Sequence, residues 1–184
     1  KRGVYDFFKD ASCGERLLLA DLTADGYRQQ ARTRYEWEPE ILGFAEFSKW
    51  KGKRVLEVGV GLGADHQQFA EAGAVTSGID LTPRAIEHTR RRLALAGLES
   101  DLHVGDAEQL PFADGTFDLV YSWGVILNCP NIQQAVNEIH RVLKPGGKLI
   151  VADMHIPTTF MGAVVSHISR WFFMQPKIGE NIRG

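Results

Sequence analysis

VLEVGVGLG, residues 55–63, joins a short apolar run to three glycines at alternate positions, Gly59, Gly61 and Gly63. The apolar run predicts a buried strand that breaks into a tight loop. Glycine is used where the backbone approaches a ligand closely or takes a positive φ. A glycine-rich turn between a strand and a helix is the usual nucleotide-binding corner of an open parallel sheet. We therefore expect the backbone of these glycines to contact a nucleotide-type cofactor.

Two cofactors fit this loop, and the first is NAD. The loop reads Gly59-x-Gly61-x-x-Ala64, which matches the dinucleotide-binding fingerprint. Asp80 lies 21 residues after Gly59, about where that fingerprint places an acid for the ribose. An NAD-dependent oxidoreductase is therefore one interpretation of the sequence.

Glu57 favours the second cofactor, S-adenosylmethionine (SAM). This residue precedes the first glycine by two positions, where a dinucleotide would place its pyrophosphate. Two like charges about 4 Å apart repel by roughly 4 kcal/mol at an effective dielectric constant of about 20. SAM has no phosphate, and its sulfonium and ammonium groups are cations that a carboxylate favours. The alternative role for Glu57 is to cap local backbone amides.

Four further blocks follow the glycine loop in a fixed order. They are residues 78–81 (GIDL), 105–112 (GDAEQLPF), 114–122 (DGTFDLVYS) and 141–151 (RVLKPGGKLIV). In this order and spacing, the blocks closely resemble the class I SAM-dependent methyltransferases. The branch they resemble includes the small-molecule enzymes of ubiquinone and menaquinone biosynthesis. The resemblance covers about residues 50–153.

Strands and helices alternate from residue 54 onward. Short apolar runs predict strands near 54–58, 75–79, 100–104, 117–121 and 147–153, and helical patterns predict helices near 63–72, 83–96 and 131–143. Thr82 is the expected N-cap of the second helix, with Pro83 in its first turn. This alternation predicts an α/β fold, a Rossmann-like three-layer sandwich with a mostly parallel sheet.

The length of 184 residues suits one domain with three parts. Residues 1–50 are expected to be a helical extension that covers the cofactor or substrate, and residues 51–156 the SAM-binding core. Residues 157–184 form an apolar helical stripe, interpreted as a helix packed on the sheet, a lid, an interfacial membrane contact or the remainder of a truncated domain. His167 and Arg170 interrupt the stripe too much for a membrane span.

The family's sheet normally has seven strands, and its last two are not recognisable in this sequence. We therefore expect the final strands to be missing. An exposed sheet edge favours pairing with another chain, and a homodimer would cover it.

The resemblance implies a role for each cofactor-site residue. Glu57 is expected near the ammonium group of SAM, and the glycine backbone against its methionine part. Asp80 is expected to accept hydrogen bonds from the ribose hydroxyls, and a cap of the next helix is the alternative. The adenine is expected to contact Leu81, Asp106 and the Ala107 amide, with Asp106 as an ordinary turn acid in the alternative. Ser122 is expected to line the site through its backbone.

Acceptor and catalytic residues are less defined. Many relatives carry a histidine pair where this chain has Asn128 and Cys129, and Asn128 cannot act as a base at neutral pH. His155 is the remaining candidate base, and a structural histidine is the alternative. Trp123 is expected either to stack on a flat acceptor or to fill the core. Residues 32–35 (RTRY) contain two arginines, and one of them is expected to bind the SAM carboxylate with two hydrogen bonds. The alternative is a solvated helix with Tyr35 packed inward.

Composition excludes several function classes. The net charge of −2 provides no general attraction to nucleic acid, and the run at 90–92 (RRR) is expected to be a solvated helix face. Two cysteines and six scattered histidines lack ligand spacing, so we expect no metal site. The first 15 residues lack the apolar core of a signal peptide, so a cytoplasmic location is expected.

Together these features predict a SAM-dependent methyltransferase that moves a methyl group to a small organic acceptor by in-line displacement, with S-adenosylhomocysteine as product. Two alternatives stay open: an NAD-dependent oxidoreductase and a SAM-binding module without catalytic activity.

Overall fold

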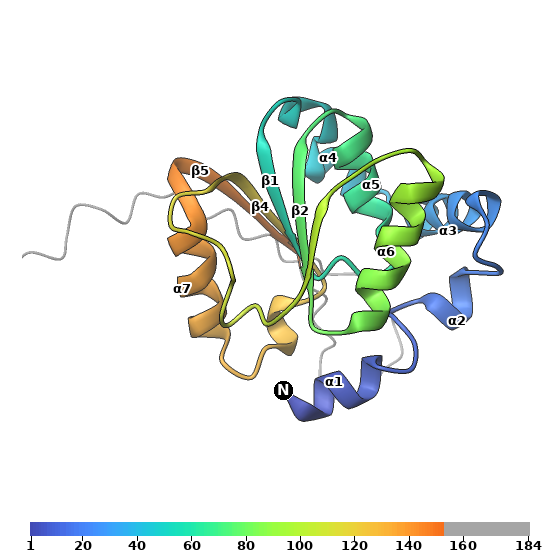
Figure 1. The fold of residues 1–184 in the computed structure, drawn as a ribbon, viewed down its shortest axis with the longest axis horizontal. Coiled ribbons are helices and arrows are strands. Elements are labelled where there is room, and N and C mark those ends of the chain that lie inside the picture. Colours follow the sequence, from blue (N-terminus) through green and yellow to red (C-terminus); the bar gives the residue numbers. More distant parts are fainter. Residues whose placement is uncertain (153–184) are drawn as a thin grey trace, which may run out of the picture.

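A computed structural model describes residues 1–152 and shows three layers around a five-stranded parallel sheet (Figure 1). The strand order is β3-β2-β1-β4-β5, so the chain reverses its direction of winding between β1 and β4. Ligands of open sheets bind beyond the carboxyl ends of the strands at such a switch point. The strands are β1 (Arg54–Val58), β2 (Val75–Asp80), β3 (Asp101–Val104), β4 (Phe117–Trp123) and β5 (Leu143–Ala152).

Helices cover both faces of the sheet. On one face lie α5 (Ala64–Glu71) and α6 (Pro83–Leu95), and on the other lies α7 (Ile132–Val142) (Figure 1). A short 3₁₀ turn, η2 (Ile126–Asn128), precedes α7. This arrangement confirms the predicted Rossmann-like three-layer α/β sandwich.

Alternate residues of the central strands pack into two separate cores. Val55, Leu119 and Tyr121 pack with Phe69 of α5 on one face. Leu56, Val58, Val120 and Ile139 of α7 belong to the core on the other face. Because both faces are covered, the strands are apolar on both sides, as expected for a buried parallel sheet.

The N-terminal segment is helical, as predicted for residues 1–50. Its two first helices contain no buried residue and lie below the carboxyl ends of the strands in Figure 1. Tyr27 and Gln30 of the third helix are buried. The elements are α1 (Arg2–Phe8), α2 (Glu15–Leu18), α3 (Ala24–Trp37), α4 (Glu40–Ala45) and the 3₁₀ helix η1 (Phe47–Trp50).

The predicted helices and first four strands agree with the structure to within about two residues, but β5 begins earlier than predicted. Leu143 already pairs with Phe117, and the register then shifts so that Lys148 pairs with Leu119. The intervening residues bulge out of the ladder, with Gly146 at a φ of 78°. The residues between Leu143 and Lys148 therefore form a bulge inside the strand.

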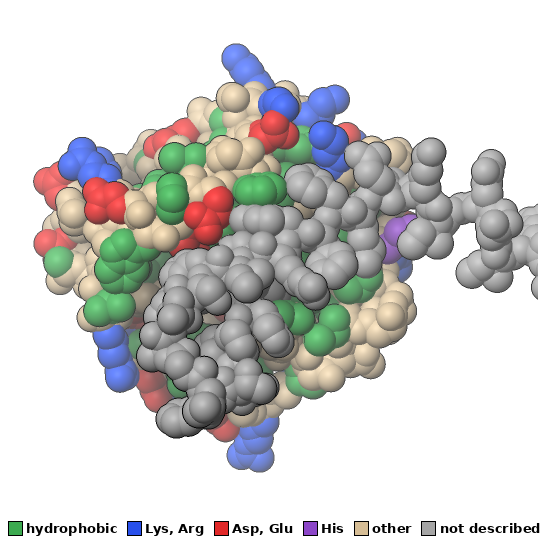
Figure 2. All heavy atoms as spheres, turned by 180° about the vertical axis from the view of Figure 1, so that it is seen from behind, with side chains coloured by type: hydrophobic (Ala, Val, Ile, Leu, Met, Phe, Trp, Pro, Cys, Tyr) green, Lys and Arg blue, Asp and Glu red, His purple; other side chains and the backbone are tan. Residues whose placement is uncertain are grey.

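Charged side chains of both signs are interspersed on the face shown in Figure 2, in keeping with a net charge of −2. Within residues 1–152, no helix combines the length and apolar character needed to cross a bilayer. The predicted tail at 157–184 and His155 lie outside the described residues.

Candidate cofactor site

A cavity of about 570 Å³ lies beyond the carboxyl ends of β1, β2 and β4. One wall consists of the loops that follow these strands, and the other consists of residues from α1, α2 and α3. Ligand pockets for small molecules typically measure about 300–1,000 Å³. The cavity is therefore large enough for a nucleoside cofactor, and it lies at the predicted switch point of the sheet.

The three glycines of the β1–α5 loop have different reasons for being glycine. All three have positive φ, at 86°, 51° and 75° for Gly59, Gly61 and Gly63. A Cβ at Gly59 would lie 2.1 Å from Val125 Cγ2, and one at Gly63 would lie 2.8 Å from Thr89 Oγ1. A Cβ at Gly61 meets no described atom within 4 Å, and this residue lines the cavity. Gly61 is thus the glycine of the loop whose missing side chain leaves open space in the cavity.

Asp80 ends β2 at the edge of the cavity. Its Oδ2 accepts a hydrogen bond from the Gly61 amide at 3.1 Å. Its Oδ1 accepts bonds from the amide and the hydroxyl of Thr82, each at 3.0 Å. Burial raises the pKa of Asp80, and these donors oppose that rise. The carboxylate therefore supports the glycine loop and the start of α6, where Thr82 is the N-cap as predicted.

Glu57 is buried and contacts His66, a residue that the sequence analysis did not select. Nδ1 of His66 lies 3.0 Å from Glu57 Oε2, and Nε2 lies 2.8 Å from Ser100 Oγ. Ser100 donates its hydrogen to the Thr76 carbonyl, so Nε2 carries the proton toward Ser100. Burial lowers the pKa of His66 to about 4 and raises that of Glu57 well above its usual value. Nδ1 therefore accepts a hydrogen bond from the Glu57 carboxyl group, and the pair has no net charge.

This pairing changes the electrostatic argument made from the sequence. Repulsion of a diphosphate by Glu57 assumes an isolated carboxylate, whereas the folded chain places a histidine on it. None of the hydrogen bonds of Glu57 within the described residues goes to a backbone amide, so the predicted capping role is not seen. Glu57 still lines the cavity.

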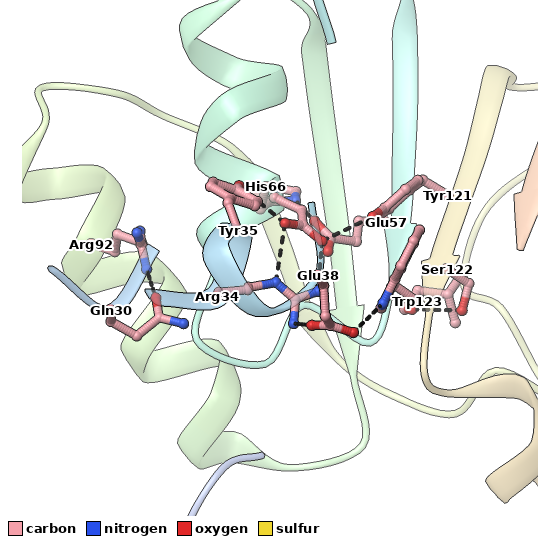
Figure 3. A network of polar contacts seen from close by, with 12 residues as sticks. Gln30, Arg34, Tyr35, Glu38, Glu57, His66, Arg92, Tyr121, Ser122 and Trp123 are labelled. Atoms are coloured by element: carbon pink, nitrogen blue, oxygen red, sulfur yellow. Dashed lines mark hydrogen bonds and ion pairs between the residues drawn. The ribbon is translucent and has the colours of Figure 1, made fainter. Parts of the chain in front are cut away.

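Asp65, in the first turn of α5, accepts hydrogen bonds from three side chains on two other elements, α3 and β4. Its carboxylate accepts hydrogen bonds from Arg34 Nη2 and from the Tyr121 hydroxyl, both at 2.9 Å, and from the Tyr35 hydroxyl at 3.1 Å (Figure 3). Arg34 also contacts Glu38 at 2.9 Å. This cluster fixes α3 against the glycine loop, with Tyr35 packed inward and Arg34 on the cavity wall.

The predicted adenine residues lie at another part of the cavity wall. Leu81, Asp106 and Ala107 all line it. Asp106 Oδ1 accepts a hydrogen bond from the Glu108 amide at 2.9 Å. The ammonium of Lys1 lies 2.7 Å from Asp106 and 2.9 Å from Glu108, which connects α1 to this loop.

Comparison with known proteins identifies the family. The model of the methyltransferase domain family matches residues 56–151, just over half of the chain. The chain belongs to this methyltransferase family. Membership of this family establishes SAM as the cofactor and does not favour the NAD-dependent alternative.

Relatives of this methyltransferase chain confirm the resemblance to quinone-biosynthesis enzymes. It is 34% identical to a demethylmenaquinone methyltransferase of Tropheryma whipplei, covering 66% of the chain and 54% of that protein. It is 35% identical to the sterol 4-C-methyltransferase strm-1 of Caenorhabditis elegans, covering 54% and 30%. The PH0226 protein of Pyrococcus horikoshii OT3 has a similar solved structure, with a TM-score of 0.61, 28% identity and coverage of 76% and 65%. The chain thus spans about half the length of the first of these relatives.

The residues of the methyltransferase cavity fit SAM. Gly61 leaves open space beside the loop, and Asp80 and Asp106 supply acceptors. Ser12 Oγ is buried on the cavity wall and has no hydrogen-bond partner among the described residues, as expected for a group that a ligand satisfies.

The segment after β4, where the sequence analysis placed acceptor and catalytic candidates, forms another part of the cavity wall. Ser122 lies inside the sheet, where its hydroxyl donates to the Val58 carbonyl at 3.0 Å, and the next residue, Trp123, lines the cavity instead. The Trp123 indole stacks on Tyr121 and donates to Glu38 at 2.8 Å. Asn128 also lines the cavity, with its amide nitrogen donating to the Gly124 carbonyl at 3.1 Å.

Sequence reasoning missed Asp65, Gln30 and Arg92 in this methyltransferase. The run at 90–92 was expected to be solvated, and this is wrong for Arg92, which is only 3% exposed. Arg92 lies seven residues after Ala85 and three after Thr89, on the buried stripe of α6. This helical spacing is the sequence feature that could have predicted the burial of Arg92. The hydrogen-bond partners of Arg92 lie on α3, α5 and the glycine loop. Because these elements are distant in the sequence, the local sequence pattern around Arg92 does not predict them.

Proposed function

We propose that this chain is the SAM-binding part of an enzyme that methylates a small organic acceptor with an apolar portion. The observation that carries this proposal is a single cavity with two unlike walls. The glycine loop, Asp80 and Asp106 form a polar wall suited to a nucleoside. Val4, Phe8, Leu17, Trp123 and Pro130 contribute apolar surface to the same cavity.

The names of two relatives support an apolar acceptor. One relative is named for demethylmenaquinone and another for a sterol, both of which are largely apolar molecules. Apolar side chains on a cavity wall favour such a molecule, because binding removes apolar surface of both the molecule and the wall from contact with water. Trp123 offers a flat surface on which a ring can stack.

In this proposal, the cofactor residues keep the roles that the sequence analysis gave them. Asp80 accepts from the ribose hydroxyls, Asp106 and Ala107 recognise the adenine, and Glu57 lies near the ammonium group. Residues 1–50 serve as a cover, with α1 and α2 enclosing the site. Lys1 holds this cover to the Asp106 loop, and Glu15 of α2 holds it to α6 through its ion pair with Arg84.

SAM supplies a methyl group on a positively charged sulfur, which is already activated for displacement. The protein therefore mainly has to hold the acceptor beside the donor and exclude water, and such positioning can contribute roughly 7–11 kcal/mol. Asn128 can orient an acceptor by a hydrogen bond, but it cannot remove a proton at neutral pH. His155 stays a candidate base in this proposal.

Two measurements test the function. S-adenosylhomocysteine at 100 times its dissociation constant should add about 2.7 kcal/mol to the free energy of unfolding, whereas NAD should add none. Transfer of a labelled methyl group from SAM to a naphthoquinone or sterol acceptor should then distinguish an enzyme from a binding module. Stabilisation by NAD alone would overturn the proposal, and binding without transfer to any acceptor would favour the inactive module.

A further inference from the structure

Arg92 is a buried cation that contacts only neutral acceptors among the described residues. Its guanidinium donates to Gln30 Oε1 and Gln67 Oε1, each at 2.6 Å, and to the carbonyl oxygens of Tyr27 at 2.9 Å and Leu62 at 3.1 Å. No carboxylate of residues 1–152 forms an ion pair with it. Buried charges are usually paired with opposite charges. Arg92 therefore places a positive charge beside the glycine loop that no contacting carboxylate neutralises, and Asp65 and Glu71 act on it only from a longer distance.

Gln30 lies between Arg92 and the cavity and presents a hydrogen-bond donor to the cavity. Its side chain is 3% exposed and lines the cavity wall. Its amide oxygen accepts from Arg92, and Figure 3 shows the amide nitrogen on the other side, toward Arg34. Among the described residues, this nitrogen donates no hydrogen bond. The bond to Arg92 thus fixes which end of the amide faces the site, and that end is a donor.

Arg34, the more obvious cation of the cavity, is already neutralised. Its guanidinium contacts Asp65 at 2.9 Å and Glu38 at 2.9 Å, so two carboxylates oppose one positive charge. Burial lowers the pKa of Arg92 to about 10, which indicates that its positive charge is held at a cost. An anion near Gln30 would reduce that cost. The carboxylate of the amino-acid part is the one anionic group of SAM.

We propose that Gln30 donates a hydrogen bond to the carboxylate of SAM, and that Arg92 is the positioning residue that orients the Gln30 amide and supplies positive potential. The inference rests on the proposed function, because it needs SAM in this cavity. It assigns Gln30 to the binding of the amino-acid part, apart from Asp80 and Asp106, which serve the nucleoside.

The test compares two ligands that differ in the amino-acid part. S-adenosylhomocysteine has the carboxylate, whereas 5′-methylthioadenosine has the same nucleoside and thioether without it. Calorimetry on Gln30→Leu should show S-adenosylhomocysteine binding weakened by about tenfold or more, the loss expected for a hydrogen bond to a charged group. Binding of 5′-methylthioadenosine should be unchanged.

Gln67→Leu is the matched control. Gln67 accepts from Arg92 at the same 2.6 Å distance as Gln30 but lies outside the cavity lining. This variant should lose a similar amount of stability and bind both ligands as the unaltered chain does. Arg92→Lys keeps the charge but lacks the planar fork. It should weaken S-adenosylhomocysteine alone, and its effect should nearly vanish in the Gln30→Leu background.

The outcomes separate this inference from the function on which it rests. If the unaltered chain binds neither ligand, the proposed function fails and the inference fails with it. If it binds both, but Gln30→Leu weakens neither or weakens both equally, only the assignment of Gln30 is overturned. Additive effects of Arg92→Lys and Gln30→Leu would overturn the positioning role of Arg92.

Discussion

At the scale of single residues, the Asp80 carboxylate has a structural role and is free to take the proposed ribose-binding role as well. The sequence analysis treated ribose binding and helix capping as alternatives for this residue. The structure shows that its oxygens already accept from Gly61 and Thr82 and still line the cavity. A carboxylate has about four lone-pair positions, so both roles are compatible.

Replacing Asp80 should therefore affect stability as well as affinity. Asp80→Ala leaves the amides of Gly61 and Thr82 without an acceptor, which should lower the free energy of unfolding by about 1–3 kcal/mol. Binding of S-adenosylhomocysteine should weaken by about tenfold or more, since the variant also loses an acceptor of charge-assisted hydrogen bonds. Urea unfolding and calorimetry measure the two effects.

Asp118→Asn is the control for this prediction. Asp118 also accepts a backbone amide, that of Arg54 at 2.9 Å, but it does not line the cavity. The control should change stability and leave the dissociation constant of S-adenosylhomocysteine as it is. An Asp80→Ala variant with unchanged affinity would remove Asp80 from the site.

At the scale of elements, the β1–α5 loop divides its glycines between packing and ligand space. Gly59→Ala places a Cβ against Val125 at a φ of 86°, and should cost about 3 kcal/mol or more of stability. Gly61→Ala meets open space, so it should cost only about 1–2 kcal/mol of backbone strain while its methyl group obstructs the cavity. Thermal unfolding and S-adenosylhomocysteine binding should therefore rank the two variants in opposite orders.

A second substitution checks the cause of the Gly59 effect. Val125→Ala removes the methyl groups that the new Cβ would meet, so it should restore part of the stability of Gly59→Ala. It should not restore ligand binding in Gly61→Ala. Equal rescue of both variants would show that the two glycines are not distinguished as described.

The elements were predictable where the deciding signals are local. Apolar runs defined the buried strands, and the Thr82-Pro83 cap defined the start of α6. The glycine loop and Asp80 were found in the same way, because each follows a strand directly. Asp65, Gln30 and Arg92 were not found, because their partners come from elements about 30–60 residues away in the chain. From the sequence alone, a run of three arginines predicts a solvated helix face. In the folded chain, α3 and α5 supply hydrogen-bond acceptors for one of the three, Arg92.

At the scale of the whole molecule, the Glu57–His66 pair connects global stability to pH. In the folded chain, burial raises the pKa of Glu57 and lowers that of His66 to about 4, which favours a pair in which Glu57 holds the proton and His66 is neutral. Unfolding restores pKa values near 4.3 for glutamate and 6.5 for histidine. Between these values, the folded and unfolded pair bind the same number of protons, so the pair adds no pH dependence. Above about pH 6.5, the folded pair binds one proton more, and stability falls as pH rises.

Glu57→Gln isolates this effect because it keeps a donor toward His66 and cannot ionise. Without Glu57, the lowered pKa of His66 contributes stability that is present above about pH 6.5 and lost as pH falls toward 4. The stability of the unaltered chain relative to Glu57→Gln should thus decrease with rising pH. The decrease should approach 1.4 kcal/mol per pH unit until Glu57 ionises in the folded state. Urea unfolding of the ligand-free chains between pH 5 and pH 8 measures it.

Glu108→Gln is the control, because the pKa of Glu108 is lowered and not raised in the folded chain. Lys1 and the Asn131 amide hold the pKa of Glu108 below its usual value, so this carboxylate is ionised in both states above about pH 5. The stability difference between the unaltered chain and Glu108→Gln should stay constant from pH 6 to pH 8. If the difference for Glu57→Gln is equally constant over that range, Glu57 is a charged carboxylate in the folded chain. The buried corner before the glycine loop would then have the negative charge that the sequence argument assumed.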